Sequence, residues 1–321
     1  MKKTKVFTPI QSVLICGASG FIGRNIAERL AKRQDLEVYG TYFGTKPSIK
    51  GISLTRVDLT KELEVSRIVR GMDIVIQAAA VTSGSRDIVT KPYLHVTDNA
   101  IMNSLIFKSC FDNHVKHVVF FSCTVMYPSK SSPVKEQDFN YKITDKYFGV
   151  GWTKVYLEKM CEFYSNISDT KYTAIRHSNI YGPHDKYDLD KSHFFGATIT
   201  KVLTTHNNKI VVWGDGSEER DLLYVSDLVD FVEDILKKQK DPFELINIGQ
   251  GKAFSVKDVV RKIIEVSGKK IKLEFDLSAP TIKFNLSVNI DRARKKYNFR
   301  PKVSLEKGIE KTIEWHKQNI L

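Results

Sequence analysis

Short apolar runs alternate with stretches of helical periodicity along the first half of the chain. The runs with the length and composition of buried strands lie at residues 12–16, 37–42, 73–79, 117–122 and 171–176, and another ends at residues 57–58. The stretches with apolar residues three and four positions apart lie at residues 21–32, 93–114 and 151–165. Strands that are separated by helices predict a parallel sheet with helices on both faces, so we expect an α/β fold.

The pattern changes after Pro183, where polar loops separate shorter elements. Three serines have the position of helix N-caps, namely Ser226, Ser255 and Ser304. Ser255 also stands three residues before Asp258, which is capping-box spacing with aspartate in place of the usual glutamate. We expect residues 1–183 to form the main domain and residues 184–321 to form a smaller α/β lobe, with some elements crossing over.

Composition favours a globular protein that binds neither nucleic acid nor a membrane. The 321 residues are 42% hydrophobic and 27% charged, and the net charge is +13. The basic residues after residue 250 lie on helical patterns, and no helix-turn-helix, RNA-recognition or zinc-finger signature is present. A basic surface also attracts small polyphosphate ligands. No apolar run approaches the ~20 residues that span a bilayer.

The cysteines and the first residues favour the cytoplasm. The four cysteines, Cys16, Cys110, Cys123 and Cys161, include no CxxC pair and no cluster with histidine at metal-ligand spacing, so we expect no disulfide framework and no metal. The basic start of the chain resembles the first part of a signal peptide, but Pro9, Gln11 and Ser12 interrupt the apolar stretch that would have to follow.

A glycine-rich loop between the first strand and the first helix predicts a Rossmann-type dinucleotide site. The loop contains Gly17, Ser19, Gly20, Phe21, Ile22 and Gly23. Glycines in this context allow a tight turn, a close approach of the backbone to a pyrophosphate, and tight packing of the helix on the sheet. The phosphates would then bind free N–H groups at the helix N-terminus. A glycine triplet alone is weak evidence, but its place in the first strand–helix unit supports the interpretation.

The second strand favours NADP over NAD. An NAD site places an acidic residue at the end of this strand to bind the ribose hydroxyls, but residues 37–46 have no acid there. Arg24 and Lys46 are candidates to face a 2′-phosphate. Asp58, with Leu59, suits the adenine, and Ala78, Ala79 and Ala80 provide small side chains where the cofactor would cross the sheet edge.

Motifs along nearly the whole chain resemble the extended short-chain dehydrogenase/reductase family of nucleotide-sugar enzymes. They are the glycine loop, Ala78–Ala80, Asn99, Tyr127-Pro128, Lys154 with Glu158, residues 176–183, Arg220-Asp221, Tyr224-Val225 and Asp227. Within that family, the GDP-fucose synthase branch is the most similar, on residues 179–185, Ser192-His193 and residues 211–214 before Arg220. The resemblance implies that Lys154 anchors the cofactor and that Asn99 holds Lys154 or a water molecule in place.

The chain departs from that family at its catalytic tyrosine. The family pairs a tyrosine with a lysine four residues later, and here Val150 stands four residues before Lys154. Tyr147 is the nearest phenol. Cys123, followed by Thr124, stands where the family has serine or threonine, and Val125 stands where the epimerising cysteine of GDP-fucose synthases falls. Cys123 shares a strand face with position 125, so it is a candidate for that role.

The resemblance also implies a set of substrate contacts. His193 matches the acid/base histidine of the family, and a histidine near neutral pKa can protonate a carbanion beside a ketone. The other implied substrate contacts are Asn179, Trp213, Arg220 and Lys283. Arg220 is a sensible choice on chemical grounds too, because a guanidinium group matches the oxygens of a diphosphate.

These residues and the resemblance predict an NAD(P)-dependent epimerase or reductase that acts on a 4-keto or deoxy hexose linked to a nucleoside diphosphate. The resemblance favours GDP as that nucleoside diphosphate. The proton donor would be Tyr147, Cys123, Thr124 or water. One alternative is a non-catalytic protein that binds the cofactor and the nucleotide sugar, because Val150 replaces the tyrosine. Another is an NAD-dependent 4-epimerase of a different nucleotide sugar. A dehydratase is disfavoured, because residues 124–126 supply no acid. We expect a homodimer, formed through the helices near residues 93–114 and 151–165.

Overall fold

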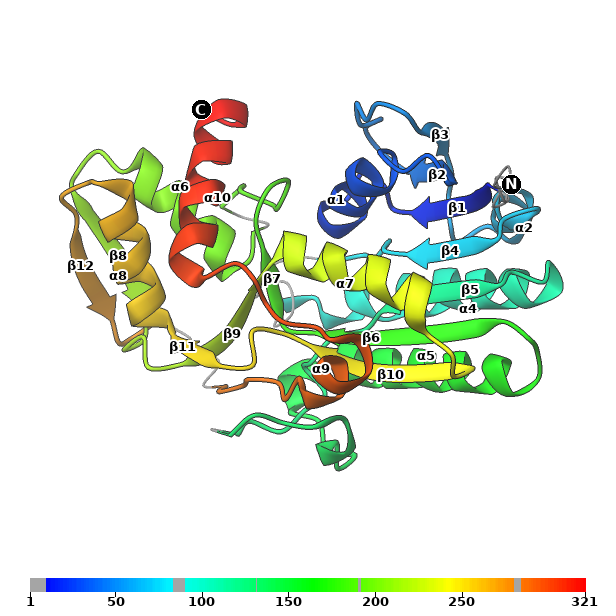
Figure 1. Ribbon diagram of the computed structural model, residues 1–321. Helices are drawn as coiled ribbons and strands as arrows, with labels where there is room; N and C mark the ends of the chain where they lie inside the picture. Colours follow the sequence, from blue (N-terminus) through cyan, green and yellow to red (C-terminus); the bar gives the residue numbers. More distant parts are fainter. Residues whose placement is uncertain (1–9, 83–89, 131, 190–191, 280–283) are drawn as a thin grey trace, which may run out of the picture.

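Seven parallel strands form the central sheet of the larger lobe (Figure 1). The computed structural model describes residues 10–82, 90–130, 132–189, 192–279 and 284–321. The strands, in their order across the sheet, are β10 (Phe243–Ile248), β6 (Lys171–His177), β5 (His117–Phe121), β4 (Ile74–Gln77), β1 (Gln11–Cys16), β2 (Leu36–Tyr42) and β3 (Ser53–Arg56). The sheet confirms the predicted α/β fold of Rossmann type.

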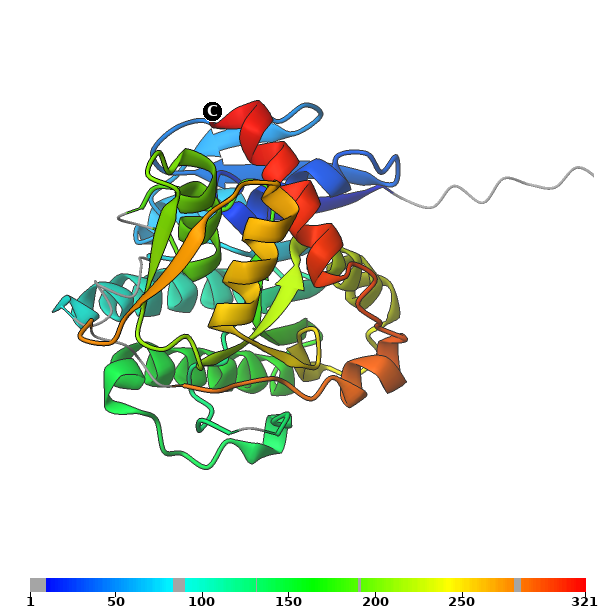
Figure 2. The ribbon, with the colours of Figure 1, turned by 90° about the vertical axis from the view of Figure 1, so that its left-hand side faces the viewer.

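Helices cover both faces of this sheet because its central strands are apolar on both sides. In β1, Val13 and Ile15 point into one core, and Leu14 and Cys16 point into the other. The first core is closed by α1 (Phe21–Leu30) and α7 (Val225–Lys238), with α9 (Asp291–Tyr297) against β10. The second core is closed by α2 (Glu62–Val69), α4 (Thr97–Asp112) and α5 (Phe148–Asn166). The two layers of helices are visible in Figures 1 and 2.

The strand order creates a crevice beside β1. The chain moves from β1 to β2 and β3 on one side, and then returns to β4 on the other side of β1. The loops that leave the carboxyl ends of β1 and β4 therefore diverge toward opposite faces. Ligands of open parallel sheets bind at such a switch point, outside the carboxyl ends of the strands.

The smaller lobe stands next to these carboxyl ends (Figure 1). It contains a three-stranded sheet of β11 (Ala253–Ser255), β9 (Glu219–Tyr224) and β7 (Asn179–Tyr181), and a two-stranded sheet of β12 (Lys272–Asp276) and β8 (Lys209–Trp213). Its helices are α6 (Phe194–Thr204), α8 (Val256–Ser267) and α10 (Leu305–Asn319), of which α8 and α10 pack side by side (Figure 2). A third apolar cluster, which includes Phe195, Ile263 and Ile309, holds the helices on the sheet.

The structure corrects two details of the sequence prediction. Ser226 lies inside α7, whose N-cap is Tyr224, whereas Ser255 and Ser304 cap α8 and α10 by accepting hydrogen bonds from the N–H groups three residues later. Helix α5 begins at Phe148, before the predicted start at residue 151, because its first turn follows directly on a 3-10 turn. Strand β10 comes from the segment assigned to the smaller lobe and completes the central sheet beside β6, as the expected crossing of some elements allows.

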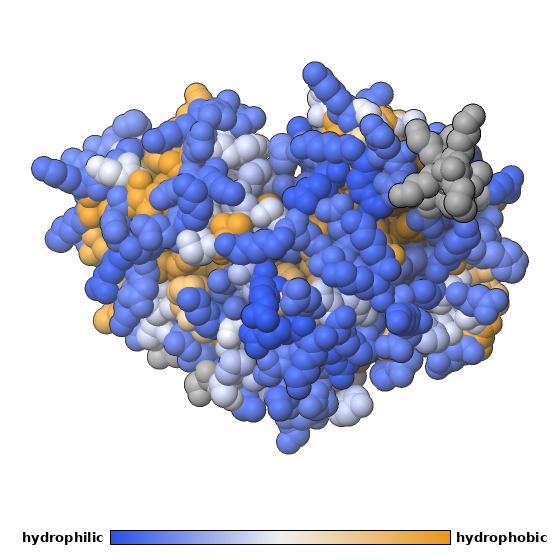
Figure 3. Space-filling model, in the orientation of Figure 1, coloured by the Kyte–Doolittle hydropathy of each residue, from blue (hydrophilic) through white to orange (hydrophobic). Residues whose placement is uncertain are grey.

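Hydrophilic side chains cover most of the face of the molecule shown in Figure 3. Within the described parts of the chain, we find no helix that combines the length and the apolar character needed to cross a membrane.

Candidate active site

A cavity of about 720 Å³ lies at the carboxyl ends of the central strands, and residues of both lobes line it. The predicted site residues that line it are Gly17, Ser19, Gly20, Phe21, Ile22, Asp58, Leu59, Ala78, Ala79, Ala80, Cys123, Thr124, Tyr147, Lys154, Asn179, His193 and Arg220. Those that do not line it are Gly23, Arg24, Asn99 and Trp213, and Lys283 falls outside the described residues. The structure thus brings residues from positions 17 to 220 of the sequence around one cavity.

The glycine loop is shaped so that only glycine fits at its two ends. Gly17 has a φ of +80°, and a Cβ atom there would lie 2.7 Å from the Cα of Ala79. A Cβ atom at Gly23 would lie 2.2 Å from the carbonyl oxygen of Gly17, so this glycine lets α1 pack against the loop. Gly23 therefore acts by packing, which explains why it does not line the cavity.

The first turn of α1 is suited to an anion. Its N-cap, Gly20, offers no side-chain acceptor, and no acidic residue lies in the first turn. The first N–H groups of a helix have no partner within the helix, and the helix dipole favours negative charge at this end. With the open turn at Gly17, these features fit the pyrophosphate of a dinucleotide.

At one end of the cavity, residues at the end of β2 and directly after β3 would surround the adenosine half of a dinucleotide. Thr41, Tyr42 and Phe43 line this end, and the Asp58 carboxylate accepts hydrogen bonds from the Thr60 N–H (3.0 Å) and hydroxyl (2.6 Å). These bonds, the hydroxyl first, lower the pKa of Asp58. The carboxylate is therefore fixed in its charged form beside the cavity.

Two arginines lie near this end of the cavity, and the role of Arg24 toward a 2′-phosphate stays a prediction. Arg24 bonds Glu28 at 2.9 Å, so its guanidinium is already paired on the surface of α1. Arg56, which the sequence pattern did not single out, ends β3 opposite Tyr42 and donates to the Phe43 carbonyl oxygen at 3.0 Å. Since β2 and β3 are neighbours, the last residues of both strands reach the same corner, and only the strand pairing reveals this.

Lys154, on α5, lies in the wall of the cavity. Its ammonium group donates a hydrogen bond of 2.8 Å to the carbonyl oxygen of Phe121, and it stands 4.7 Å from the ring centre of Phe120. Burial lowers the pKa of Lys154, while Cys123 and Glu158 act in the opposite direction. A cation with one backbone bond keeps further donors for the hydroxyl groups of a ligand.

A buried ion pair fixes the helix that carries Lys154. Glu158, one turn later on α5, accepts two hydrogen bonds from the Arg176 guanidinium, at 2.9 and 2.6 Å, and one from Ser122 at 2.5 Å. Arg176 also donates to the Tyr127 hydroxyl at 2.8 Å, and that hydroxyl donates to Asn247. The network ties α5 to β5, β6 and β10, so Lys154 is held in a fixed position by its neighbours.

Val150 and Tyr147 lie in the cavity wall on the same side of α5 as Lys154. Positions 150 and 154 are four apart, which places them on one face of α5. Tyr147 is the N-cap residue of α5, and its ring packs edge-on against Phe284, with 5.8 Å between ring centres. Helix α5 therefore begins early enough to direct Tyr147 toward the cavity.

Cys123 and Thr124 follow β5 and complete this part of the wall. Burial raises the pKa of the Cys123 thiol, although the nearby Lys154 cation lowers it, so the thiol form is favoured. Thr124 is buried and lines the cavity, and its carbonyl oxygen accepts from the Tyr127 N–H at 3.1 Å.

His193 enters the cavity from the smaller lobe as the N-cap residue of α6. Burial lowers its pKa, and electrostatic interactions with Lys186 and His95 lower it further. The imidazole is therefore neutral at neutral pH and can accept a proton. Asp185 also lines the cavity, and burial raises its pKa to about 7. Asp185 ends the motif at residues 179–185, but the sequence pattern assigned it no role of its own, because the shift arises from its surroundings.

Arg220 supplies a buried cation on the smaller-lobe side. Its guanidinium donates to the carbonyl oxygens of Glu219 and Phe284, and burial lowers its pKa. Asn179 lies close by, and its amide donates to the carbonyl oxygen of Asp221 at 3.3 Å. A guanidinium held by two carbonyl groups in a cavity is suited to phosphate oxygens.

Two other predicted residues have different surroundings. Asn99 bonds both the N–H and the carbonyl group of Val81, at 2.9 and 3.0 Å, and so orders the loop that follows β4. Its contact with Lys154 stays a prediction, because the bond from Lys154 goes to Phe121. Trp213 is 54% exposed at the end of β8 and lies outside the cavity wall.

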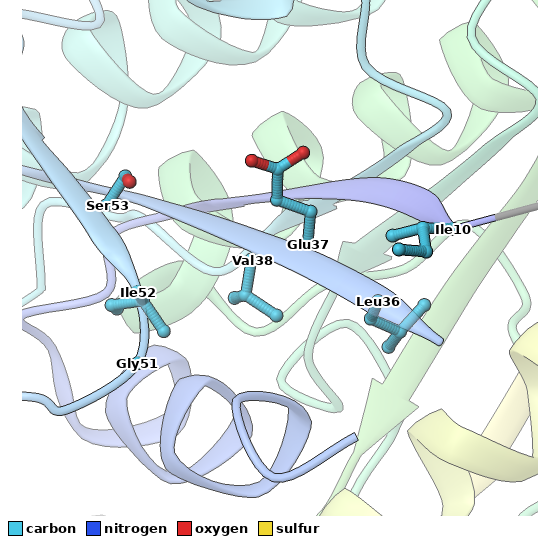
Figure 4. A pocket seen from close by; sticks show the side chains of 7 residues that line it. All are labelled: Ile10, Leu36, Glu37, Val38, Gly51, Ile52 and Ser53. Carbon is cyan, nitrogen blue, oxygen red and sulfur yellow. The ribbon is translucent and has the colours of Figure 1, made fainter. Parts of the chain in front are cut away.

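A second hollow lies away from the first, on the outer part of β2. It is lined by Ile10, Leu36, Glu37, Val38, Gly51, Ile52 and Ser53, and Figure 4 shows Glu37 as its one charged side chain. The lining residues come from the beginning of the strand, opposite to the end that meets the glycine loop. We assign no ligand to this hollow.

Three comparisons relate the chain to known proteins. The sequence model of the NAD dependent epimerase/dehydratase family matches residues 13–249. The chain is 26% identical over 313 residues to GDP-L-colitose synthase of Yersinia pseudotuberculosis, covering 94% of this chain and 97% of that protein. It is 28% identical over 320 residues to GDP-L-fucose synthase of Sinorhizobium fredii, covering 96% of each. The fold is similar to that of UDP-glucose 4-epimerase of Thermotoga maritima, with a TM-score of 0.86 and 22% identity, over 97% of this chain and 100% of that one.

Proposed function

Because this chain belongs to the NAD dependent epimerase/dehydratase family and is an NAD(P)-dependent enzyme, we propose that it epimerises or reduces a nucleoside-diphosphate 4-keto hexose, with GDP as the carrier. The observation that carries the proposal is the shared cavity. It joins the glycine loop, Lys154, His193 and Arg220, which are the groups needed for a dinucleotide and a diphosphate-linked sugar.

In this proposal, residues of the larger lobe bind the cofactor and residues of the smaller lobe bind the nucleotide sugar. The glycine loop and the first turn of α1 hold the pyrophosphate, and Lys154 binds the ribose next to the nicotinamide. When bound, the dinucleotide supplies or accepts a hydride. Arg220 and Asn179 hold the diphosphate-linked sugar against this half of the cavity.

His193 performs the epimerisation chemistry in this proposal. A proton on the carbon beside a ketone is acidic enough to be removed by a positioned base, because the ketone stabilises the carbanion. The neutral imidazole of His193 accepts that proton, and an acid on the opposite face, for which Cys123 and water are the candidates, delivers a proton to the carbanion there. Two predicted catalytic groups, Cys123 and Thr124, lie in the same wall and are candidates to assist.

We also propose a preference for NADP. The end of β2 carries Thr41, Tyr42 and Phe43 and has no carboxylate to bind the ribose hydroxyls. Arg56 is the basic group placed beside Phe43, where a 2′-phosphate would be stabilised.

A homodimer is consistent with the outer side of α4 and α5. Ile101, Tyr156, Phe163 and Ile167 are each 41% to 57% exposed and lie on or directly after these adjacent helices. Apolar side chains grouped on a surface are typical of an interface. We propose that a second copy of the chain covers them. Sedimentation of a Phe163→Lys variant tests this, and a wild-type protein that sediments as a monomer would contradict it.

The function is tested with NADPH and a GDP-linked 4-keto-6-deoxyhexose. Oxidation of NADPH indicates reduction, and solvent deuterium in the sugar indicates epimerisation. We expect a His193→Asn variant to lose exchange by ~10²–10⁴, which is the typical contribution of a positioned acid/base group. His206→Asn is the matched control, because His206 is exposed and lies outside the cavity. Tight binding of both ligands with neither reaction would support a non-catalytic binding protein instead.

A further inference from the structure

The cavity wall contains an aliphatic side chain where a proton donor for the sugar oxygen is needed. Val150 lines the cavity one turn before Lys154, and it has no group that can carry a proton. Reduction of a ketone requires a proton as well as a hydride. Under the proposed function, another residue must therefore deliver this proton, and it must lie in the same part of the wall.

Tyr147 is held firmly in that part of the wall. Its N–H donates to the carbonyl oxygen of Thr144 at 2.8 Å, and its ring packs against Phe284. The following turn of α5 is closely packed, since a Cβ atom at Gly149 or at Gly151 would come within 2.9 Å of a neighbouring side chain. This packing limits the movement of the first turn, so the phenol keeps its place beside the cavity.

A cation stands beside this phenol. Arg220 and Tyr147 both line the cavity, and Phe284 contacts both, with its carbonyl oxygen on Arg220 and its ring on Tyr147. Burial raises the pKa of Tyr147, and the Arg220 charge lowers it. The phenol is therefore protonated at neutral pH, and a phenolate formed from it would be stabilised by the neighbouring guanidinium.

Lys154 is too far away to stabilise the phenolate of Tyr147 directly. Seven residues separate them, which is roughly 10 Å along a helix at 1.5 Å per residue. The Lys154 ammonium instead donates to the carbonyl oxygen of Phe121, and its charge acts on Cys123. The two cations of the cavity thus serve different groups.

We propose that Tyr147 donates the proton to the sugar oxygen during reduction and that Arg220 stabilises the phenolate that remains. This inference rests on the proposed function. The carbonyl carbon accepts a hydride from the reduced cofactor, which is oxidised, and the O–H bond of Tyr147 breaks as the O–H bond of the new alcohol forms. Water then returns a proton to the phenolate.

The first test compares Tyr147→Phe with the wild type, using NADPH and a GDP-linked 4-keto-6-deoxyhexose. Tyr141→Phe is the matched control, because Tyr141 is 67% exposed and lies outside the cavity wall. We expect Tyr147→Phe to lower kcat for reduction by ~10²–10⁴. Solvent deuterium exchange, which depends on His193, and the Kd values of NADPH and GDP should stay unchanged, as should every property of Tyr141→Phe.

Several results would overturn the assignment. A raised KM with unchanged kcat would make Tyr147 a binding residue only, and an unchanged reduction rate would move the donor to Cys123, Thr124 or water. If the wild type exchanges deuterium but never reduces the sugar, Tyr147 is not a proton donor for reduction and the protein is an epimerase only. A wild type that does neither would remove the proposed function itself.

The second test needs no turnover. The ultraviolet difference between wild type and Tyr147→Phe, followed against pH without ligands, reports the titration of Tyr147 alone. We expect this titration to move to higher pH in Arg220→Gln. An unmoved titration would show that Arg220 does not stabilise the phenolate.

Discussion

The ammonium group of Lys154 donates to the carbonyl oxygen of Phe121, which is the last residue of β5, at a distance of 2.8 Å. This bond joins the helix that carries the lysine to the strand edge where the cavity opens. It directs a buried cation toward the ligand without a carboxylate partner at hydrogen-bond distance among the described residues.

Replacing Lys154 should therefore weaken ligand binding without weakening the fold. We expect Lys154→Met to raise the Kd of NADPH by about tenfold to a hundredfold, because hydrogen bonds to charged groups contribute ~1.5–3 kcal/mol. The free energy of unfolding should be equal or higher, since a buried cation is removed. Calorimetry and urea unfolding measure the two quantities. Lys159→Met, an exposed site on the same helix, should change neither.

The glycine loop should not tolerate a side chain at its first position. Gly17→Ala would place a Cβ atom 2.7 Å from Ala79 at a φ of +80°. We expect a loss on the order of 1–3 kcal/mol in the free energy of unfolding and loss of dinucleotide binding. Gly44→Ala is the control, because no atom lies within 4 Å of its Cβ position. Equal behaviour of the two variants would contradict the close approach.

Removing one charge of the Glu158–Arg176 ion pair should lower the free energy of unfolding. Glu158→Gln leaves a buried guanidinium without its carboxylate, so we expect a loss of ~3–5 kcal/mol in the free energy of unfolding. A double variant with methionine at both positions should lose less than Glu158→Gln alone. If the double variant were the least stable, the two residues would contribute through packing more than through their charges. Urea unfolding of the three proteins decides this.

Asp185 should give the stability a pH dependence of unusual sign. Burial raises its pKa to about 7 from an ordinary value near 3.8, so between those values the folded state keeps a proton that the unfolded state has released. The contribution of Asp185 to the free energy of unfolding should then fall as the pH rises from about 4 to about 7, by up to ~4 kcal/mol, and stay level above that range. The difference in free energy of unfolding between wild type and Asp185→Asn should change with pH over this range, whereas the difference for Asp169→Asn, an exposed control, should not.

Local patterns were sufficient where neighbours in the sequence are neighbours in space. The loop from Gly17 to Gly23 follows β1 and opens α1 as predicted, because a strand, a glycine turn and a helix start are contiguous. The same reason explains why Tyr147, the N-cap residue of α5, and Lys154 both line the cavity. The start of α5 at Phe148 was missed, since two glycines in the first turn disfavour a helix unless tertiary packing compensates, as it does here.

Partners chosen from distant segments could not be read from the sequence. The loop after β4 bonds the amide of Asn99, and the predicted contact of Asn99 with Lys154 or a water molecule stays a prediction. Arg56 was missed because its position follows from the pairing of β3 with β2, and strand order is not encoded in periodicity. The role of Lys283 stays a prediction.

Strand β10 lies at the edge of the sheet beside β6, although 65 residues separate the end of one from the start of the other. During synthesis, one row of backbone groups of β6 therefore stays unpaired until β10 has left the ribosome. Exposed strand edges pair readily with other chains. We expect a truncated protein that ends at residue 183 to aggregate when expressed, and chaperone demand to be greatest over this interval of translation.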